Sequence, residues 1–512
     1  MDPISDSRRS FIQGTAATMT MAAAPTVCSG SPVDRDTAAL LELSAAEAVA
    51  RMARGEMTVE RYASALLARC EALRALNAFI ALDPTRVLEA ARACDKRRAA
   101  GEKPGPLFGL PIPVKDSVNT ADYPTTAGTP GLRDFRPADD APIVKSLRAG
   151  GALVLGKTNL HELSYGWTSN NQAFGAVHNP YDPKRIPGGS SGGTAAAVAA
   201  RMAPLGVAED TEGSIRVPAA MCGISGFRPS TGRYSTRACV PISPLFDQVG
   251  PHARNVADLA LFDSVAASDG SPLQAPSLQG LRLGVVRDYW FVGLDPEVER
   301  VTDRALEQLR SAGVEIVETE LPGLQHLIAT TTEPVQNHDV RVALTRFLHD
   351  YGAKPTFEQI VAQASPDIQA IFRASVLPGS KGFVSEHTYT AARDVHLPAL
   401  RRLYEDYFAR TGVTAVVFPT TMAPAPLIGE DEVVEIRGQK VSFFKIAGRN
   451  IAPGSSAGLP GLVLPAGLTA HGLPVGIEFD GPAGSDRALL ALGLSLERAL
   501  GAIPAPDRKS VV

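Results

Sequence analysis

Three short segments of the chain carry residue types that could do chemistry. In residues 110–116 (LPIPVKD), an apolar run flanked by prolines leads directly to Lys115. An amine at the end of a buried strand loses hydration, which lowers its pKa and lets it act as a base. Taken alone, this segment favours an ordinary solvated surface pair of Lys115 and Asp116.

The other two segments are rich in glycine and serine. Residues 187–194 (PGGSSGGT) place Ser190 among glycines, which permit close backbone approach and unusual φ and ψ angles. A flexible linker has a similar composition, but this run leads directly into an Ala-rich helical stretch and lacks the lysine of a phosphate loop. In residues 209–219 (EDTEGSIRVPA), Ser214 follows a tight turn. Such a turn can expose a hydroxyl beside backbone N–H groups, as a nucleophile with an oxyanion hole requires.

Together the three segments resemble the amidase signature family. The resemblance rests on GGSSGG, on the serine of GSIRxPA 24 residues after Ser190, and on PxxVKD. It is strong over residues 37–270, good over 413–500 and weak over 320–412. It implies an α/β protein, with a large mixed β-sheet core flanked by α-helices. It also implies a single domain over residues 37–505, with a mostly helical insertion at about 320–412. Because this insertion resembles little else, we expect it to cap the acyl pocket and to be the main determinant of specificity.

The resemblance implies roles for individual residues. In that family the catalytic residues are a serine, a serine after a cis peptide bond, and a lysine. Carried over, Ser214 is the acyl nucleophile, Ser190 is the bridging serine and Lys115 is the base. The same resemblance implies that an oxyanion is bound by backbone N–H groups, those of Thr211, Glu212, Gly213 and Ser214. It also implies that the acyl pocket is lined by the side chains of Ser164, Trp167 and Asn170. Simple core packing is the alternative for Trp167.

Glu212 departs from the family pattern, which has two glycines before the nucleophile. The backbone N–H survives this change, because it does not depend on the side chain. A carboxylate pointing at a forming oxyanion would be unfavourable. We therefore expect the Glu212 side chain to point toward Arg216 or solvent, and we expect Arg216 to pair with Asp210 or Asp247.

Residues 185–228, 424–440 and 481–486 resemble the indoleacetamide and mandelamide hydrolase branch of the family. That resemblance implies hydrolysis of a small aryl or arylacetamide-type amide, through a Ser acyl-enzyme, to a carboxylate and ammonia or an amine. An acyltransferase, or a carbamate or ester hydrolase, would use the same acyl-enzyme. A catalytically silent binding protein on this fold is a further alternative, for which Glu212 is the one hint.

Helices and short buried strands alternate around these segments, as in an α/β sheet protein. The sequence predicts helices over 45–54, from 58 to about 76, and over 140–149, 194–202 and 296–312, with strands over 110–114, 152–155, 282–286, 315–318, 413–418 and 462–465.

Composition narrows the possible partners. The chain has 512 residues, 45% of them hydrophobic, and a net charge of −4, so it can bury a large core and lacks the basic excess of a nucleic-acid binder. No apolar run reaches the roughly 20 residues that a membrane helix needs. Five dispersed cysteines and nine dispersed histidines show no metal-ligand spacing, so we expect no metal and no cofactor. The expected partner is a small-molecule amide, and a homodimer is left open.

The first 30 residues differ from the rest of the chain. Arg8 and Arg9 precede a weakly apolar stretch rich in Ala, Thr and Met, which ends in small residues. This order is typical of a twin-arginine export signal and predicts a periplasmic enzyme. If the segment is only a tail, the enzyme stays in the cytoplasm.

Overall fold

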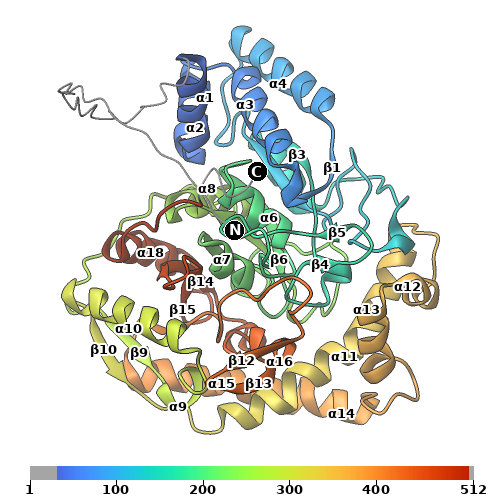
Figure 1. Ribbon diagram of the computed structural model, residues 1–512, viewed down its shortest axis with the longest axis vertical. Coiled ribbons are helices and arrows are strands. Elements are labelled where there is room, and N and C mark those ends of the chain that lie inside the picture. The colour runs from blue at the N-terminus through green and yellow to red at the C-terminus, as the bar shows by residue number, and fades with distance from the viewer. Residues whose placement is uncertain (1–31, 507–512) are drawn as a thin grey trace, which may run out of the picture.

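A mixed sheet of eleven strands forms the centre of the molecule (Figure 1). The computed structural model describes residues 32–506, so the predicted export signal at 1–30 lies outside the described residues. The strand order is β1 (Phe79–Leu82), β3 (Leu153–Thr158), β2 (Pro111–Lys115), β6 (Leu205–Asp210), β8 (Gln248–Ala253), β7 (Ser225–Arg228), β14 (Gly461–Leu468), β15 (Pro474–Asp480), β11 (Ala415–Pro419), β9 (Arg282–Val285) and β10 (Glu315–Glu318). This architecture is the α/β fold predicted from the sequence.

Helices cover the sheet and extend beyond it (Figure 1). They are α1 (Pro32–Glu42), α2 (Ala45–Arg54), α3 (Val59–Ala72), α4 (Pro84–Ala99), α5 (Pro142–Ala149), α6 (Gly192–Ala199), α7 (Arg216–Cys222), α8 (Val256–Ala266), α9 (Arg287–Trp290), α10 (Pro296–Ser311), α11 (Leu324–Asp350), α12 (Phe357–Gln363), α13 (Pro366–Ile371), α14 (Glu386–Ala391), α15 (Leu397–Thr411), α16 (Phe443–Ala447), α17 (Ala452–Ala457) and α18 (Asp486–Leu500). Two hairpins stand apart from the main sheet, β4 (Asn170–Asn171) with β5 (Gly175–Ala176), and β12 (Val433–Ile436) with β13 (Gln439–Ser442).

The strands around residues 110–116, the segment that contains Lys115, are parallel and fully buried. β2 pairs in parallel with β3 and β6, and every residue of these three strands is buried. A strand covered on both faces reads as a continuous apolar run rather than an alternating one, which is the pattern of residues 110–114. Lys115 is the last residue of β2 and lies opposite Thr158 of β3.

Alternate residues of β14 show which helices cover which face of the sheet, because successive side chains of a strand point to opposite faces. Val463 packs with Ala195 of α6 and Ala219 of α7. Leu462 and Leu464 instead belong to the core cluster that includes buried residues of α10 and α18. Helices α6 and α7, which follow the two glycine- and serine-rich segments, therefore share one face of the sheet.

Several predicted elements end elsewhere in the structure. The helix expected to reach residue 76 ends at Ala72, and a separate 3₁₀ turn covers Arg74–Leu76. The strand expected over 152–155 covers Leu153–Thr158 instead. It continues through Gly156 because the absent side chain lets β1 approach: a Cβ there would lie 2.5 Å from the carbonyl oxygen of Ala81. Helix α6 spans 192–199 rather than 194–202.

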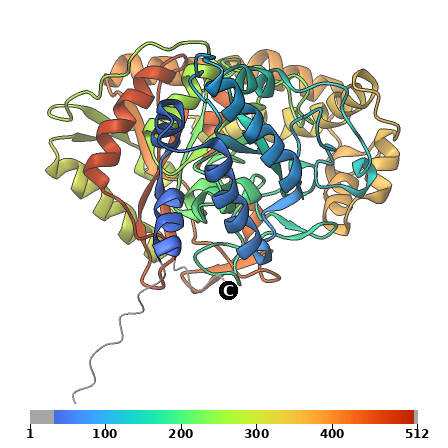
Figure 2. The same ribbon diagram turned by 90° about the horizontal axis from the view of Figure 1, so that it is seen from above.

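Residues 320–412 are mostly helical and contain α11 to α15. Figures 1 and 2 place α11 to α14 toward one end of the molecule, away from α10 and α18. Side chains of this segment, among them Phe347 and Phe372, form their own core cluster with Leu132 and Phe135. No helix within residues 32–506 is long and apolar enough to span a bilayer.

Candidate active site

Lys115 lies buried at the end of β2 and contacts two side chains from later segments. Its Nζ donates to Ser190 Oγ at 2.6 Å and to Glu209 Oε1 at 2.6 Å. Burial lowers the pKa of Lys115, and the negative charge of Glu209 opposes that shift. Lys115 and Asp116 do not form a solvated surface pair, since Asp116 is buried and pairs with Lys157 at 3.0 Å.

Ser190 is held by backbone contacts within the glycine-rich segment. The Gly189–Ser190 peptide bond is cis, as the resemblance implied. The carbonyl oxygen of Ser190 accepts the N–H of His161 at 3.0 Å and the hydroxyl of Ser169 at 3.2 Å. Gly193 is required here, because a Cβ would lie 2.4 Å from the carbonyl oxygen of Asn159. The segment is a close-packed turn before α6, and its Ser190 hydroxyl reaches Lys115.

Ser214 lies in the tight turn between β6 and α7. Its hydroxyl forms no hydrogen bond with another described residue, and Ser214 lines a cavity. The N–H of Ser191 donates to the carbonyl oxygen of Ser214 at 3.2 Å, which joins the two serine-bearing turns. Hydroxyls that relay protons are often further apart before substrate binds than during the reaction.

Asp210 organises the turn that carries Ser214. Its carboxylate accepts the N–H of Gly213 at 2.6 Å and the N–H of Ile215 at 2.9 Å. Gly213 was predicted to offer its N–H to an oxyanion, but this N–H is donated to Asp210 instead. The backbone N–H groups of Thr211, Glu212 and Ser214 donate to no other described residue, so these three are free to face a substrate.

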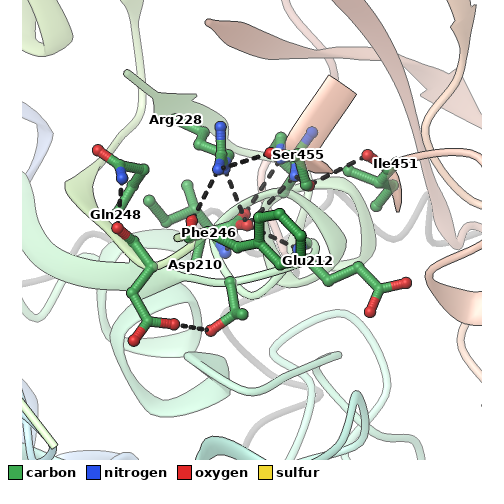
Figure 3. Close-up of polar contacts among 12 residues, drawn as sticks. Asp210, Glu212, Arg228, Phe246, Gln248, Ile451 and Ser455 are labelled. Atoms are coloured by element: carbon green, nitrogen blue, oxygen red, sulfur yellow. Dashed lines mark hydrogen bonds and ion pairs between the residues drawn. The ribbon is translucent and has the colours of Figure 1, made fainter. Parts of the chain in front are cut away.

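Beneath the turn, buried arginines neutralise Asp210 (Figure 3). Arg216 Nε lies 3.1 Å from Asp210, and Arg216 Nη1 lies 2.6 Å from Glu478 of β15. Arg228 lies 3.4 Å from Asp210. Burial on its own would raise the pKa of Asp210, but the two arginines outweigh it and lower that pKa to about 2.

Of the two carboxylates expected for Arg216, the structure selects Asp210. Asp247 accepts the Thr211 hydroxyl at 2.6 Å and the N–H groups of Ile242 and Ser243. Burial and the nearby charge of Glu209 raise the pKa of Asp247 to about 7. Asp247 therefore supports the beginning of the same turn through Thr211.

A cavity of about 360 Å³ opens above Ser214. Of the predicted substrate contacts, Ser164, Trp167, Thr211 and Glu212 line it. Asn170 does not: it lines a neighbouring cavity and donates to the carboxylate of Asp431 at 3.3 Å. The chain turns between Trp167 and Asn170, because Ser169 adopts a positive φ of 54°. Trp167 packs edge-on against Phe444, with ring centroids 4.7 Å apart.

The Glu212 side chain does not take the predicted direction. Figure 3 shows it pointing away from Asp210 and Arg228. It is partly buried at the cavity wall, where its Oε2 accepts Gln336 Nε2 at 2.6 Å. Burial, followed by the charge of Glu333, raises the pKa of Glu212 to about 8. The Glu212 side chain takes this direction because helix α11 covers the side of the turn where we expected solvent.

Sequence reasoning missed two contributors to this site. Glu209 accepts hydrogen bonds from Lys115, from Ser164 at 2.5 Å and from Ser117 at 3.3 Å. Its position in the same block as Ser214 was the available signal. Gln336 had none, because it belongs to the segment with the weakest resemblance, although that segment was expected to cap the acyl pocket and does line it. Helix α11 contributes Ile328, Ala329, Thr332, Glu333, Gln336 and Asn337 to the cavity wall.

Within residues 32–506, no group of three or more His, Cys, Asp or Glu side chains is placed to hold a metal ion. The groups around Ser214 are hydroxyls, backbone donors, the carboxyl groups of Glu212 and Glu333 and, behind Ser190, the buried amine of Lys115. A serine hydroxyl, an amine that can act as a base and backbone donors can together perform acyl transfer.

Known proteins match this chain over nearly its whole length. The amidase family model matches residues 61–490. An indoleacetamide hydrolase of Agrobacterium vitis is 40% identical over 465 residues, covering 91% of this chain and 98% of that protein. A mandelamide hydrolase of Pseudomonas putida is 37% identical over 487 residues, covering 92% of this chain and 94% of that protein.

Solved structures show the same fold. A crystal structure of an amidase superposes with a TM-score of 0.80 at 32% identity, covering 90% of this chain and 100% of that chain. The native peptide amidase of Stenotrophomonas maltophilia gives a TM-score of 0.73 at 30% identity, covering 91% and 98%. Residues 61–490, which the family model matches, include all three serine- and lysine-bearing segments.

Proposed function

The chain belongs to the amidase family and is an amidase, and we propose that its substrates are small aryl or arylacetamide-type amides. A cavity of about 360 Å³ is of the size that encloses a small molecule. Trp167, Tyr289 and Phe444 line it with aromatic surface. The names of two relatives, indoleacetamide hydrolase and mandelamide hydrolase, support the same substrate class.

In the proposed reaction, Ser214 attacks the amide carbonyl carbon. Its proton passes to Ser190 Oγ, whose own proton passes to neutral Lys115. The C–N bond then breaks as the departing nitrogen takes a proton back through Ser190, which leaves an acyl group on Ser214 Oγ. Water, deprotonated along the same path, releases the carboxylate and restores the Ser214 hydroxyl.

Backbone donors at the turn stabilise the negative charge of the tetrahedral intermediate. Thr211, Glu212 and Ser214 have N–H groups that donate to no described residue, and the Asp210 contacts fix the turn that carries them. Removal of one such donor typically costs a factor of ~10²–10³ in rate.

The observation that carries the proposed reaction is the hydrogen bond of 2.6 Å between buried Lys115 and Ser190. A lysine normally stays protonated at neutral pH and cannot accept a proton. Burial lowers the pKa of Lys115 and so increases the fraction that can act as a base.

The test is ammonia release from phenylacetamide, mandelamide, indoleacetamide, benzamide and a long-chain amide. We expect turnover of the aryl compounds and a loss of at least ~10³-fold in Ser214→Ala. Ser495→Ala is the matched control, because Ser495 lies on α18 and donates to the carbonyl oxygen of Pro276, outside the cavity. Equal activity of Ser214→Ala and the wild type would refute the assignment of the nucleophile.

A further inference from the structure

Glu212 brings a carboxyl group into the cavity that contains the Ser214 hydroxyl, where the family pattern has glycine. Gln336 of α11 donates to Oε2 at 2.6 Å and fixes the side chain against the cavity wall. The other oxygen, Oε1, forms no hydrogen bond with a described residue. Two residues before the proposed nucleophile, the chain therefore presents one fixed hydrogen-bond acceptor to whatever occupies the cavity.

A second acidic side chain faces the same space. Glu333 lies three residues before Gln336 on α11 and also lines the cavity. No Lys or Arg within residues 32–506 forms an ion pair with Glu212 or Glu333. The negative charge of Asp210 also raises the pKa of Glu212. Arg216 opposes that shift, but its guanidinium group forms ion pairs with Asp210 and Glu478.

Two cationic side chains, Arg449 and Lys445, also line the cavity, but neither forms an ion pair with Glu212 or Glu333. Arg449 lies over the Tyr289 ring at 4.5 Å and donates to the carbonyl oxygen of Tyr289 at 2.8 Å. Lys445, like Glu333, is exposed to solvent at the cavity wall. The part of the cavity around Glu212 and Glu333 is thus acidic, and the remaining wall combines aromatic and apolar side chains with neutral polar ones and the two cations.

We propose that Glu212 determines substrate specificity, and that the cavity accepts amides whose acyl part carries a basic amine, the ammonium group of which donates to Glu212 Oε1. This inference rests on the proposed function and names the substrate class more closely. An ammonium group supplies both a donor for Oε1 and a positive charge between two carboxyl groups. The nearby aromatic rings add favourable cation–π contact.

The pH dependence of this preference has a definite sign. The pKa of Glu212 is raised to about 8 by burial and by Glu333, so near neutral pH the free carboxyl group is largely protonated. A bound ammonium favours the ionised form. The advantage of a cationic substrate therefore grows as the pH rises toward 8, by up to ~10-fold per pH unit, and levels off above it.

The experiment compares two amides that differ only in charge. Phenylacetamides carrying an aminomethyl group or an ethyl group at the para or the meta position have nearly the same shape, and the benzylic amine stays protonated over the range assayed. We measure the ratio of their kcat/KM values with the full chain. Effects on Lys115, Ser190 and Ser214 cancel in this ratio, because both substrates use the same acyl transfer.

We expect the ratio to favour the aminomethyl compound for at least one ring position, and to increase with pH up to about 8. In Glu212→Gln, which keeps the side-chain size and can still accept from Gln336, the ratio should fall ~10–100-fold and lose its pH dependence. Glu358→Gln, an exposed residue of α12, is the matched control and should leave the ratio unchanged.

Two results would overturn the inference, and they are distinguishable. If the ethyl compounds are hydrolysed as well as or better than the aminomethyl compounds at every pH, the specificity is wrong while the proposed function stands. If no arylacetamide is hydrolysed, the proposed function fails and this inference fails with it. The wild-type pH dependence tests the inference even if Glu212→Gln does not fold.

Discussion

Replacement of Glu209 by Gln should move the activity of this enzyme to lower pH. In the proposed reaction Lys115 has to be neutral to accept the proton of Ser190, so the rate should rise with pH through the pKa of Lys115. The Glu209 carboxylate, 2.6 Å from Nζ, favours the charged form of the lysine and raises that pKa. Glutamine keeps an oxygen that can accept from Nζ but carries no charge.

The size of the shift follows from the contact distance. Two unit charges 2.6 Å apart interact by about 6 kcal/mol at an effective dielectric constant of about 20, which is an upper bound. Asp210 and Asp247 continue to act on Lys115 in the variant. A contact of this type usually shifts a pKa by ~1–3 units, so we expect the acidic limb of the profile to move down by ~1–3 pH units.

The assay is kcat/KM for ammonia release, measured as a function of pH on variants shown to be folded by thermal melting. One pH unit below the wild-type limb, Glu209→Gln should be ~10-fold faster than the wild type. Glu497→Gln, the same change on α18 at a carboxyl group that accepts the Val256 N–H, should leave the limb in place. An unmoved limb in Glu209→Gln, or one at higher pH, would refute the role of Lys115 as the base.

Two further changes test the turn and the cavity. Asp210→Asn should reduce the free energy of unfolding by ~3–5 kcal/mol in urea titrations, because Arg216 and Arg228 lose a buried partner. In the wild type, the low pKa of Asp210 means that this stabilisation is complete above about pH 4 and is lost as the pH falls toward about 2. An unchanged midpoint of urea unfolding in Asp210→Asn would contradict a stabilising role for these ion pairs. Ala329→Phe, on the cavity face of α11, should lower kcat/KM for indoleacetamide at least ~10-fold relative to propionamide while the melting temperature stays constant. An unchanged ratio would show that residues 320–412 do not shape specificity.

The sequence predicted those parts of the site that depend on local patterns. The apolar run before Lys115 left two readings open, a buried lysine and a solvated pair with Asp116, and the structure shows the lysine buried. The glycines around Ser190 indicated close backbone approach, which the contact with Asn159 explains. Motif and strand signals of this kind involve neighbours in the chain, so one sequence is enough to interpret them.

The parts that failed depend on contacts between distant segments. Glu209 acts on Lys115 only because β6 pairs with β2 in the sheet. The direction of Glu212 is set by Gln336, 124 residues later, and a single sequence contains no sign of that neighbour. Asn170 was misplaced for a local reason, since the positive φ of Ser169 redirects the chain, and a non-glycine residue gives little warning of such a turn.

The ion pairs beneath the turn that carries Ser214 join residues that are synthesised early to residues that are synthesised late. Lys115, Ser190 and Ser214 have all left the ribosome long before β15 is made, whereas Arg216 pairs with Glu478, 262 residues further along. β14 and β15 must also join β7 before the central sheet is continuous. A nascent or truncated chain that ends before β14 therefore contains every proposed catalytic side chain and still lacks the support that fixes the nucleophile. We therefore expect activity only once the last strands have been added to the sheet.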